Sequence, residues 1–318
     1  MKLLLAKLNH LGDTLLLTPT IRALRQKYPD ARIDVVVRPG CEAVLEGNRD
    51  ISRIIPSDAA LGRVLAQRYD YAFDLSNSDR SKLLIALSGA RVRAINEWHA
   101  ELGWKRAVFN RFTHFEWARE HQVLRDYRAV ADVTGLPEPG PLVLDTSVDA
   151  PAPEGPYAVI HPVSRWAFKE WLPDRWAALA DRLARRHGLQ VVFSCGPVAR
   201  ERDYLQSILS LSSQKHGSTG GGLTLRQLGR LIRGARLFAG VDTVAMHIAA
   251  AVQAPVLALF GPSSEWSWRP WQCRYELVLG PCSCKVTREF VCDKSTIYPC
   301  MAAITAESVS AAAERLLA

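Results

Sequence analysis

Residues 1–37, MKLLLAKLNHLGDTLLLTPTIRALRQKYPDARIDVVV, contain the pattern that decides the fold. Lys2–Leu8 is an apolar run of strand length, and a segment of helical period follows it to about Tyr28, where Pro29 ends the pattern. Arg32–Val37 is a second apolar run. A strand, a helix and a second strand in this order predict a βαβ unit with parallel strands.

The same alternation of strand-length and helical segments continues along both halves of the chain. The first half predicts further strands at 52–55, 71–75 and 92–95 and helices at 59–67 and 80–87. The second half predicts strands at 157–161, 189–194, 236–239 and 256–260 and helices at 174–187, 201–211, 225–233, 244–252 and 306–317. We therefore expect an α/β protein with largely parallel sheets.

The length of the chain and a proline-rich segment predict two domains. A chain of 318 residues is longer than one compact core usually holds. Prolines recur through residues 136–156, where they oppose a continuous helix or a central strand. We place a first domain at 1–150 and a second at 151–318, with the last helix as a candidate to pack back on the first domain. Ligands of such sheets bind beyond the carboxyl ends of the strands, so we look for the site in the loops there.

The composition is that of a globular protein and favours an anionic partner. Apolar residues make up 48% and charged residues 23%, and 40 Lys and Arg exceed 32 Asp and Glu by 8. This excess suits phosphates, nucleic acid or an acidic membrane surface, and its sign does not choose among them. There is no signal-peptide pattern and no apolar run of the roughly 20 residues that span a bilayer. The seven cysteines, an odd number, suit a reducing compartment, so we expect a cytoplasmic protein.

Four loops that follow predicted strands carry side chains suited to chemistry. The first, Asn9–Thr14, contains the carboxylate of Asp13. The second, HPVSRWAFKEW at 161–171, combines a hydroxyl with two cations, which suits a phosphate-containing ligand. The third, GVDTVAMHIAAA at 240–251, begins a helix whose first N–H groups suit a diphosphate, and the fourth, FGPSSEW at 260–266, is a glycine turn with two serines. The candidate residues of the last three loops are Ser164, Arg165, Lys169, Gly240, Asp242, Thr243, His247 and Gly261.

Each candidate also has an ordinary structural explanation. Asp13 and Asp242 suit helix caps, because a carboxylate there accepts backbone N–H bonds. Arg165 and Lys169 suit a solvated surface, and His247, beside alanines, suits a partly buried imidazole with satisfied hydrogen bonds. The chain has neither a dinucleotide-binding glycine fingerprint nor a nucleotide triphosphatase phosphate loop. The functional prediction therefore depends on the combination of loops.

Three separated segments carry a family resemblance. They are HLGDTLLLTPTIRALRQKYPDARIDVVV at 10–37, VIHPVSRWAFKEWLPDRWAALADRL at 159–183 and FAGVDTVAMHIAAAVQAPVLALFGPSSEWSWRPW at 238–271. Together they resemble the bacterial lipopolysaccharide heptosyltransferases of glycosyltransferase family 9, and SRWAFKEW and WSWRPW are most similar to the heptosyltransferase III branch. The resemblance covers nearly the whole chain. It implies a GT-B fold, two Rossmann-like domains facing across a cleft, with the acceptor in the first domain and the donor, ADP-L-glycero-D-manno-heptose, mainly in the second.

The resemblance also implies roles for individual residues. Asp13 matches the family's general base, which takes the proton of the acceptor hydroxyl as that hydroxyl attacks the anomeric carbon. Lys169 matches the lysine at the phosphate side of the donor, and Asp242 matches the acidic residue that contacts the donor sugar. Thr243 and His247 fall within the same donor loop. The chain departs from the family near Asn9, where an arginine is common, and at residues 244 and 246, where small residues or proline are common.

The residue types agree with an inverting transfer that needs no metal or cofactor. A carboxylate that assists the attack of a sugar hydroxyl contributes about 10² to 10⁴ in rate. Lys169, Arg165 and the helix start near Gly240 could stabilise the departing ADP. The sequence has no Asp-x-Asp metal motif and no identifiable second carboxylate for a double displacement.

Residues 97–128 interleave aromatic and basic side chains. This pattern suits nucleic acid or a phosphorylated glycolipid at a membrane surface, and it equally suits an amphipathic helix with a packed loop. With the acceptor expected in the first domain, we favour the phosphorylated inner core of lipopolysaccharide at the cytoplasmic face of the inner membrane, and we do not expect nucleic acid. The candidate acceptor residues are Asn9, His10, Lys105 and Arg106.

Five cysteines gather near the end of the chain, namely Cys273, Cys282, Cys284, Cys292 and Cys300. Their irregular spacing favours buried free thiols over a structural zinc site, and we assign no metal to them. Three enzymatic alternatives remain open: another heptosyltransferase branch, a transferase of another nucleotide sugar, and a nucleotide-sugar epimerase. A non-catalytic module that binds a nucleotide sugar or nucleic acid is the alternative from another class.

Overall fold

The computed structural model describes residues 1–97, 103–115, 120–282, 292 and 297–318. The chain divides into two compact units, Met1–Asp145 and Thr146–Ala318. The division lies within the proline-rich segment, five residues before the boundary that the sequence suggests. Residues 136–152 form neither helix nor strand.

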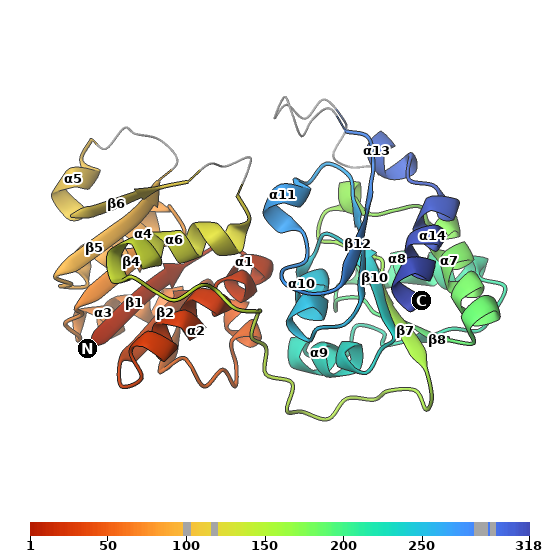
Figure 1. Ribbon diagram of the computed structural model, residues 1–318, viewed down its shortest axis with the longest axis horizontal. Coiled ribbons are helices and arrows are strands. Elements are labelled where there is room, and N and C mark those ends of the chain that lie inside the picture. Colours follow the sequence, from red (N-terminus) through yellow and green to blue (C-terminus); the bar gives the residue numbers. More distant parts are fainter. Residues whose placement is uncertain (98–102, 116–119, 283–291, 293–296) are drawn as a thin grey trace. The chain divides into compact units, whose positions relative to one another are not determined.

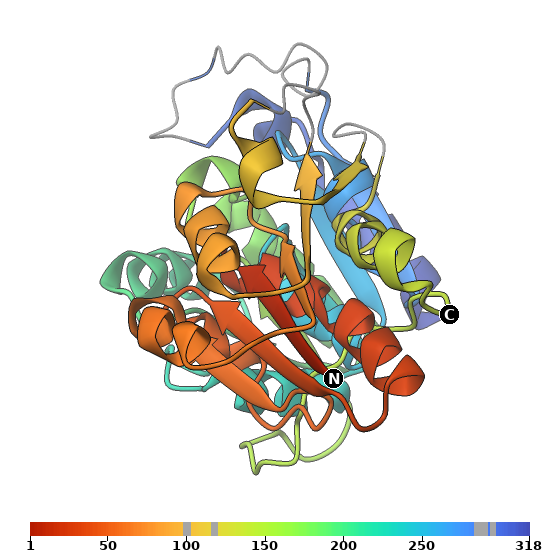
Figure 2. The same cartoon turned by 90° about the vertical axis from the view of Figure 1, so that its left-hand side faces the viewer.

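Unit 1 is built on one parallel sheet with the strand order β3-β2-β1-β4-β5-β6. Its strands are β1 (Lys2–Lys7), β2 (Arg32–Val37), β3 (Arg53–Pro56), β4 (Tyr71–Asp74), β5 (Val92–Glu97) and β6 (Arg111–His114). Its helices are α1 (Leu11–Leu16), α2 (Thr18–Lys27), α3 (Ala60–Leu65), α4 (Asp79–Leu87), α5 (Lys105–Val108) and α6 (Gln122–Thr134), with 3₁₀ turns η1 (Cys41–Val44) and η2 (Ser57–Ala59). Figure 2 shows α2 and α6 on one face of the sheet and α3 and α4 on the other.

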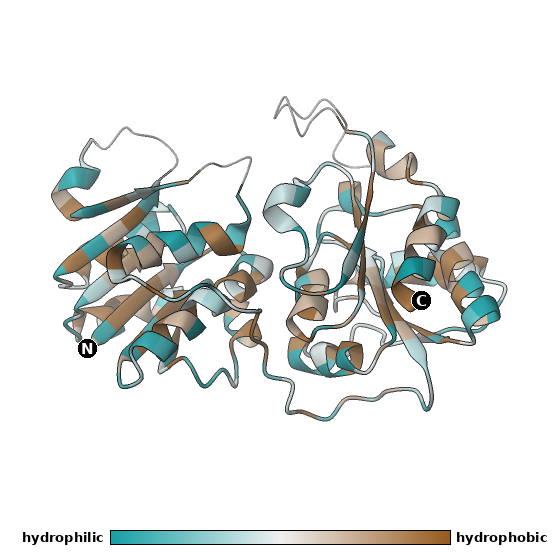
Figure 3. Cartoon of the chain, in the orientation of Figure 1, coloured by the Kyte–Doolittle hydropathy of each residue, from teal (hydrophilic) through white to brown (hydrophobic). Residues whose placement is uncertain are grey.

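The apolar run near the start of the chain forms the centre of this sheet. β1 pairs with β2 from Lys2 opposite Arg32 to Lys7 opposite Val37, and it pairs with β4 on its other side. Residues 3–6 of β1 are fully buried. A strand with neighbours on both sides and helices over both faces meets no water, which explains a continuous apolar run instead of an alternating one. Figure 3 shows the apolar colour concentrated on the strands.

The single helix predicted between β1 and β2 is wrong, because the chain forms α1 and α2 with a break at Leu17. Pro19 lies in the first turn of α2 and has no N–H for a bond to the preceding turn. The Thr18 hydroxyl donates instead to the Leu15 carbonyl, 2.7 Å away. Proline is favoured at a helix start, so it restarts the helix.

Unit 2 repeats the same winding in a second parallel sheet of order β12-β11-β10-β7-β8-β9. Its strands are β7 (Tyr157–His161), β8 (Gln190–Phe193), β9 (Gly217–Ser218), β10 (Leu237–Val241), β11 (Val256–Phe260) and β12 (Tyr275–Leu279). Its helices are α7 (Pro173–His187), α8 (Ala199–Leu211), α9 (Leu225–Arg233), α10 (Val244–Ala251), α11 (Glu265–Trp268), α13 (Pro299–Ala302) and α14 (Ala306–Leu317), with η3 (Ala167–Lys169). α7 packs against α8 and α14 on one face of the sheet, and α9 packs against α10 on the other.

The strand order places one switch point in each unit. Counted along the chain, both sheets have the order 3-2-1-4-5-6 of doubly wound folds. The direction of winding changes between β1 and β4 in unit 1 and between β7 and β10 in unit 2. Ligands of such folds bind at these points, beyond the carboxyl ends of the strands.

Three edge strands, β6, β9 and β12, were not predicted. β9 has only two residues, both exposed, and β6 and β12 carry partly exposed residues at a sheet edge, so none of the three has a continuous apolar run. α14, the last helix, packs against β12 and α7 within unit 2. None of the helices in the described parts of the chain has the length and apolarity of a membrane span.

Candidate active site

Asp242 is the centre of the unit 2 site because side chains from three segments meet at its carboxylate. It follows the carboxyl end of β10 directly. Lys169, at the end of η3, places Nζ 2.6 Å from Asp242 Oδ2. Ser263, in the turn after β11, donates a side-chain hydrogen bond to Asp242, and the His247 imidazole of α10 lies near enough to act on its charge. Residues from the loops after β7, β10 and β11 therefore converge at the switch point.

The Lys169–Asp242 pair is ionised and partly open to solvent. Burial alone would raise the pKa of Asp242, but the Lys169 ammonium, the His247 imidazole and the hydrogen bonds from Lys169 and Ser263 hold that pKa below its ordinary value. The side chain of Asp242 is 8% exposed, whereas that of Lys169 is 22% exposed. An ammonium group has three donors, so Lys169 can hold Asp242 and still contact an anionic ligand.

The N-terminus of α10 lies at the same end of β10. Thr243 is its N-cap residue, but its side chain does not cap the helix. Thr243 Oγ1 is buried and has no hydrogen-bond partner among the described residues. The first N–H groups of α10 are thus left for water or a ligand, and the helix dipole favours a negatively charged ligand.

The loop after β7 is held in place by an ion pair between the buried Glu170 carboxylate and the exposed Arg200, which sequence reasoning missed. The Ser164 N–H donates to Glu170 Oε1 at 2.9 Å. Arg200, from α8, donates to both Glu170 oxygens at 2.9 Å and to the Ser164 carbonyl. The Ser164 hydroxyl accepts from the Trp166 N–H at 3.2 Å, and the exposed Arg165 lies 5.2 Å from the Trp166 ring. Ser164 therefore shapes the loop that carries Lys169.

Gly240 and Gly261 are explained by close packing. A Cβ on Gly240 would lie 2.9 Å from the His161 carbonyl oxygen of the neighbouring strand and 3.0 Å from the Phe238 ring. A Cβ on Gly261 would lie 2.4 Å from Met301 Sδ. These glycines let the backbone around Asp242 approach its neighbours closely, a role that needs no ligand contact.

Asp13 in unit 1 caps its own helix and keeps one oxygen available. It lies in the first turn of α1, after the carboxyl end of β1, and is half-buried. Its Oδ2 accepts the His10 backbone N–H at 3.2 Å, as in a capping box. Oδ1 has no hydrogen-bond partner in the described parts of the chain. Capping and acid–base chemistry can thus share this carboxylate.

The predicted acceptor residues divide into two groups. Asn9 and His10 precede Asp13, and the buried Asn9 Oδ1 has no partner within the described ranges. Lys105 and Arg106 lie in α5, whose last residue, Val108, accepts a hydrogen bond from Arg93 near the start of β5. α5 is therefore at the amino ends of the strands, and Figure 1 shows it on the side of unit 1 opposite to α1. The structure brings Asn9 and His10 together with Asp13 but not Lys105 and Arg106.

A buried charged cluster lies beside Asp13, and sequence reasoning missed it. Lys7 ends β1, and its Nζ lies 2.9 Å from Asp126 of α6 and 3.2 Å from the Leu75 carbonyl. The side chains of Lys7 and Asp126 are only 1% and 2% exposed. Burial raises the pKa of Asp126, although Lys7 opposes the rise, and Asp13 adds to it. Burial lowers the pKa of the neighbouring Arg125 to about 10, against the opposite effects of Asp126 and Asp13. The feature of the sequence that could have indicated this cluster is a lysine at the end of an apolar strand.

The aromatic and basic stretch at 97–128 does not form one binding surface. Phe109 is part of the hydrophobic core of unit 1, and Phe112 packs against that core. Arg125 is buried, whereas Trp104 is exposed. Packing, and not acceptor binding, therefore accounts for much of the pattern. Trp98, Trp117 and Arg119 lie outside the described residues.

The C-terminal cysteines include two that interact directly. Cys282 and Cys300 share a side-chain hydrogen bond, and burial, with Cys282 adding to the effect, raises the pKa of Cys300 to about 12. The other described members, Cys273 and Cys292, are also free thiols. Cys284 lies outside the described residues. No group of three or more His, Cys, Asp or Glu in the described ranges is arranged to hold a metal ion.

Known proteins are similar to this chain over nearly its whole length. Lipopolysaccharide heptosyltransferase 3 of Escherichia coli K12 is 31% identical over 337 residues, which cover 96% of this chain and 95% of that protein. The structure of the E. coli ADP-heptose lipopolysaccharide heptosyltransferase II has a TM-score of 0.79 at 23% identity and covers 100% of this chain and 98% of its own. An E. coli heptosyltransferase with ADP has a TM-score of 0.77 at 20% identity, covering 99% and 100%.

These likenesses confirm the predicted GT-B fold. Residues 59–297 match the family described as glycosyltransferase family 9 (heptosyltransferase). The match spans the loops after β7, β10 and β11 that meet at Asp242, and the likeness to heptosyltransferase 3 of E. coli K12 covers 96% of the chain. The chain therefore belongs to glycosyltransferase family 9, the heptosyltransferases.

Proposed function

We propose that the protein transfers heptose from ADP-L-glycero-D-manno-heptose to a heptose of the lipopolysaccharide inner core, as an enzyme of the heptosyltransferase III branch. The observation that carries this proposal is the convergence of Lys169, Ser263 and His247 on Asp242 beside the open N-terminus of α10. Relatives named for heptosyltransferase 3, at 31% and 30% identity, support the branch.

In the proposed reaction, unit 2 holds the donor. The diphosphate contacts Lys169 and the first N–H groups of α10, and Asp242 accepts hydrogen bonds from hydroxyl groups of the donor sugar. As the bond between the anomeric carbon and the diphosphate oxygen breaks, ADP leaves with the bonding electrons and gains negative charge. Lys169 and the helix dipole stabilise that charge, which supports a reaction without a metal.

Unit 1 supplies the general base. Asp13 takes the proton of the acceptor hydroxyl, whose oxygen forms the new bond to the anomeric carbon. A single displacement of this kind inverts the configuration. Asn9 and His10 are the candidate acceptor contacts, whereas Lys105 and Arg106 are left out because α5 lies at the other end of the sheet.

The decisive test offers ADP-heptose together with core acceptors truncated at defined steps. Turnover only on the diheptosylated acceptor is the expected result, and turnover on a shorter acceptor would assign another branch. Donor binding without turnover on any acceptor would favour the binding module. Loss of ADP-heptose without any acceptor would favour an epimerase.

The base is tested by Asp13→Asn, which removes the charge but keeps an oxygen that can accept the His10 N–H. We expect kcat to fall by about 10² to 10⁴ while donor affinity and melting temperature stay close to those of the unchanged protein. A protein that melts much earlier but keeps full specific activity would show that Asp13 only caps α1.

A further inference from the structure

Unit 2 contains a long stretch of chain that carries positive charge alone. Residues 204–241 include five Lys and Arg and no Asp or Glu. Three of the arginines, Arg230, Arg233 and Arg236, lie in the last turn of α9 and just beyond it, and all three are exposed. We call these three side chains the α9 surface.

The cations of the α9 surface form no ion pair and no side-chain hydrogen bond with the described residues. This sets them apart from other arginines of unit 2. Arg315 is paired with Glu276, and Arg200 is paired with Glu170. The opposite side of α9 is apolar and buried, and Figure 3 shows hydrophilic and hydrophobic residues on this helix. Three exposed charges without counter-charges thus lie at the end of α9 and in the short segment that leads from it to β10.

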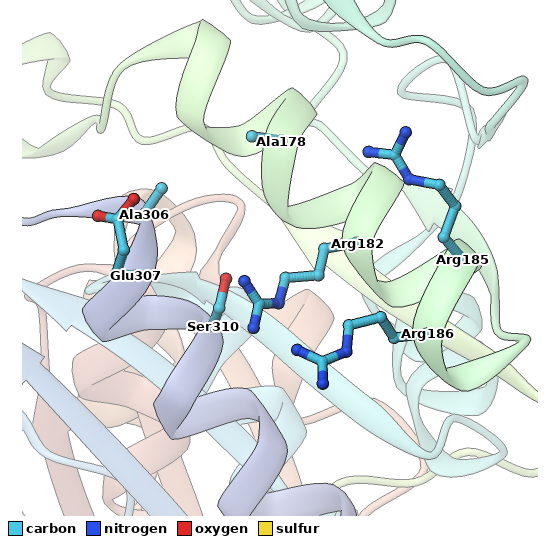
Figure 4. A pocket seen from close by; sticks show the side chains of 7 residues that line it. All are labelled: Ala178, Arg182, Arg185, Arg186, Ala306, Glu307 and Ser310. Atoms are coloured by element: carbon cyan, nitrogen blue, oxygen red, sulfur yellow. The ribbon is translucent and has the colours of Figure 1, made fainter.

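A second basic feature of unit 2 is partly neutralised. A cavity of about 370 Å³ between α7 and α14 is lined by Arg182, Arg185 and Arg186. Figure 4 shows Arg182 and Arg186 reaching from α7 towards α14. Both donate to Glu314 Oε1, at 2.9 Å and 3.0 Å. A ligand there would compete with Glu314, so the α7 arginines serve as a control and not as a candidate.

We propose that the α9 surface docks the protein on anionic lipid headgroups of a membrane leaflet. The proposal rests on the proposed function, whose acceptor is a lipid-anchored glycolipid. Basic side chains near an anionic leaflet each contribute about fivefold to binding. α9 and α7 cover opposite faces of the sheet, so one flat membrane surface can contact only one of these two sides. The α9 side is favoured because its arginines have no counter-charges among the described residues.

Nucleic acid is a weaker match to the α9 surface. Proteins that bind single strands combine basic grooves with exposed aromatic rings on which bases stack. The aromatic residues of 204–241 are Tyr204 and Phe238. Phe238 is fully buried in β10, and the Tyr204 hydroxyl donates to the Trp171 carbonyl. The α9 surface thus offers charge without stacking, as a layer of lipid phosphates requires.

The test is co-sedimentation of the full chain with vesicles of phosphatidylethanolamine and phosphatidylglycerol, and with neutral vesicles of phosphatidylcholine. The triple variant Arg230→Gln/Arg233→Gln/Arg236→Gln removes the α9 surface. We expect the unchanged protein to bind only the anionic vesicles, and the variant to bind them about a hundredfold more weakly. Added salt should weaken the binding of the unchanged protein, because exposed charges are screened within about 10 Å at 0.1 M salt.

The control variant Arg182→Gln/Arg185→Gln/Arg186→Gln removes the same three charges from α7. It should keep vesicle binding within a few-fold of the unchanged protein. Equal losses in both triple variants would mean that net charge acts without a docking surface, and unchanged binding of the α9 variant would also overturn the proposal. Release from vesicles by single-stranded RNA at equal phosphate concentration would assign the surface to nucleic acid instead.

Turnover on a deacylated, water-soluble acceptor separates docking from catalysis. The α9 variant should keep this turnover, because its changes lie outside the proposed active site. An unchanged protein that binds anionic vesicles but transfers no heptose would refute the proposed function and not the docking surface. A protein that transfers heptose but does not bind anionic vesicles would refute the docking surface and not the proposed function.

Discussion

Replacing Lys7 by Met would leave the Asp126 carboxylate in the interior of unit 1 without its cation. Nζ of Lys7 lies 2.9 Å from Asp126, and both side chains are almost fully buried. Removing one partner of a buried pair costs about 3–5 kcal/mol, because the remaining charge is not solvated. At roughly 2–4 °C per kcal/mol for a domain of this size, the melting transition of unit 1 should fall by about 10 °C.

The stability lost by the Lys7→Met variant should depend on pH in a defined direction. Burial already raises the pKa of Asp126, and the loss of Lys7 removes the charge that opposes the rise. A carboxyl whose folded pKa lies above its unfolded value of about 3.9 binds its proton more tightly in the folded state. Its contribution is therefore favourable in acid and is lost as pH rises through the folded pKa. The Lys7→Met variant should thus lose most stability at neutral pH and less near pH 5.

Urea denaturation of a double-mutant cycle measures the pair directly. Lys7→Met/Asp126→Asn removes both charges, and the asparagine oxygen can still accept from Gln122, whose Nε2 lies 3.0 Å from Asp126 Oδ1. We expect the double variant to be more stable than Lys7→Met and the coupling to reach about 2 kcal/mol or more. Additive single effects, or a loss below about 1 kcal/mol for Lys7→Met at pH 7, would refute the buried-pair reasoning.

Three further predictions concern unit 2. Lys169→Ala should chiefly weaken binding of ADP-heptose in calorimetry, and unchanged donor affinity and kinetics would remove Lys169 from the site. Gly240→Ala places a Cβ 2.9 Å from the His161 carbonyl and should destabilise the protein by about 1–3 kcal/mol in urea, whereas full stability with weaker donor binding would indicate a ligand contact instead. The Asp181 carboxylate accepts hydrogen bonds from Ser213, Gln214 and the His216 ring, and these outweigh burial and hold its pKa below the ordinary value. The stability that this carboxylate contributes is therefore present above about pH 4 and is lost as pH falls through the lowered pKa. Asp181→Asn should therefore be less stable at neutral pH and lose less on acidification, and identical acid unfolding of both proteins would contradict this.

Much of the architecture could be predicted because burial and local periodicity agree. β2, β7, β11, α9 and α14 have the predicted bounds. Each is either an apolar run covered on both faces or a helix with one apolar side, so a local pattern reports the tertiary environment. β6 and β12 lie at sheet edges, where half of the strand meets solvent and the pattern fades.

The candidate site was predictable only in part. Lys169, Asp242 and His247 follow strands directly or within one loop, so the strand order brings them together once the sheet is known. Ser263 belongs to a loop that the sequence singled out, but its contact with Asp242 depends on the turn geometry after β11. The Lys7–Asp126 pair joins residues 119 positions apart, and no local pattern encodes such a contact.

Each unit is made from one uninterrupted stretch of chain and has its own hydrophobic core. This continuity bears on synthesis at the ribosome, where domains generally fold as units with the N-terminal one first. All the strands of the first sheet have been made when residue 145 is added, so unit 1 can fold before β7 emerges. The second sheet cannot be completed so early in synthesis. β12 lies at its edge and α14 closes its face, so unit 2 is completed only after Ala306–Leu317 have been translated.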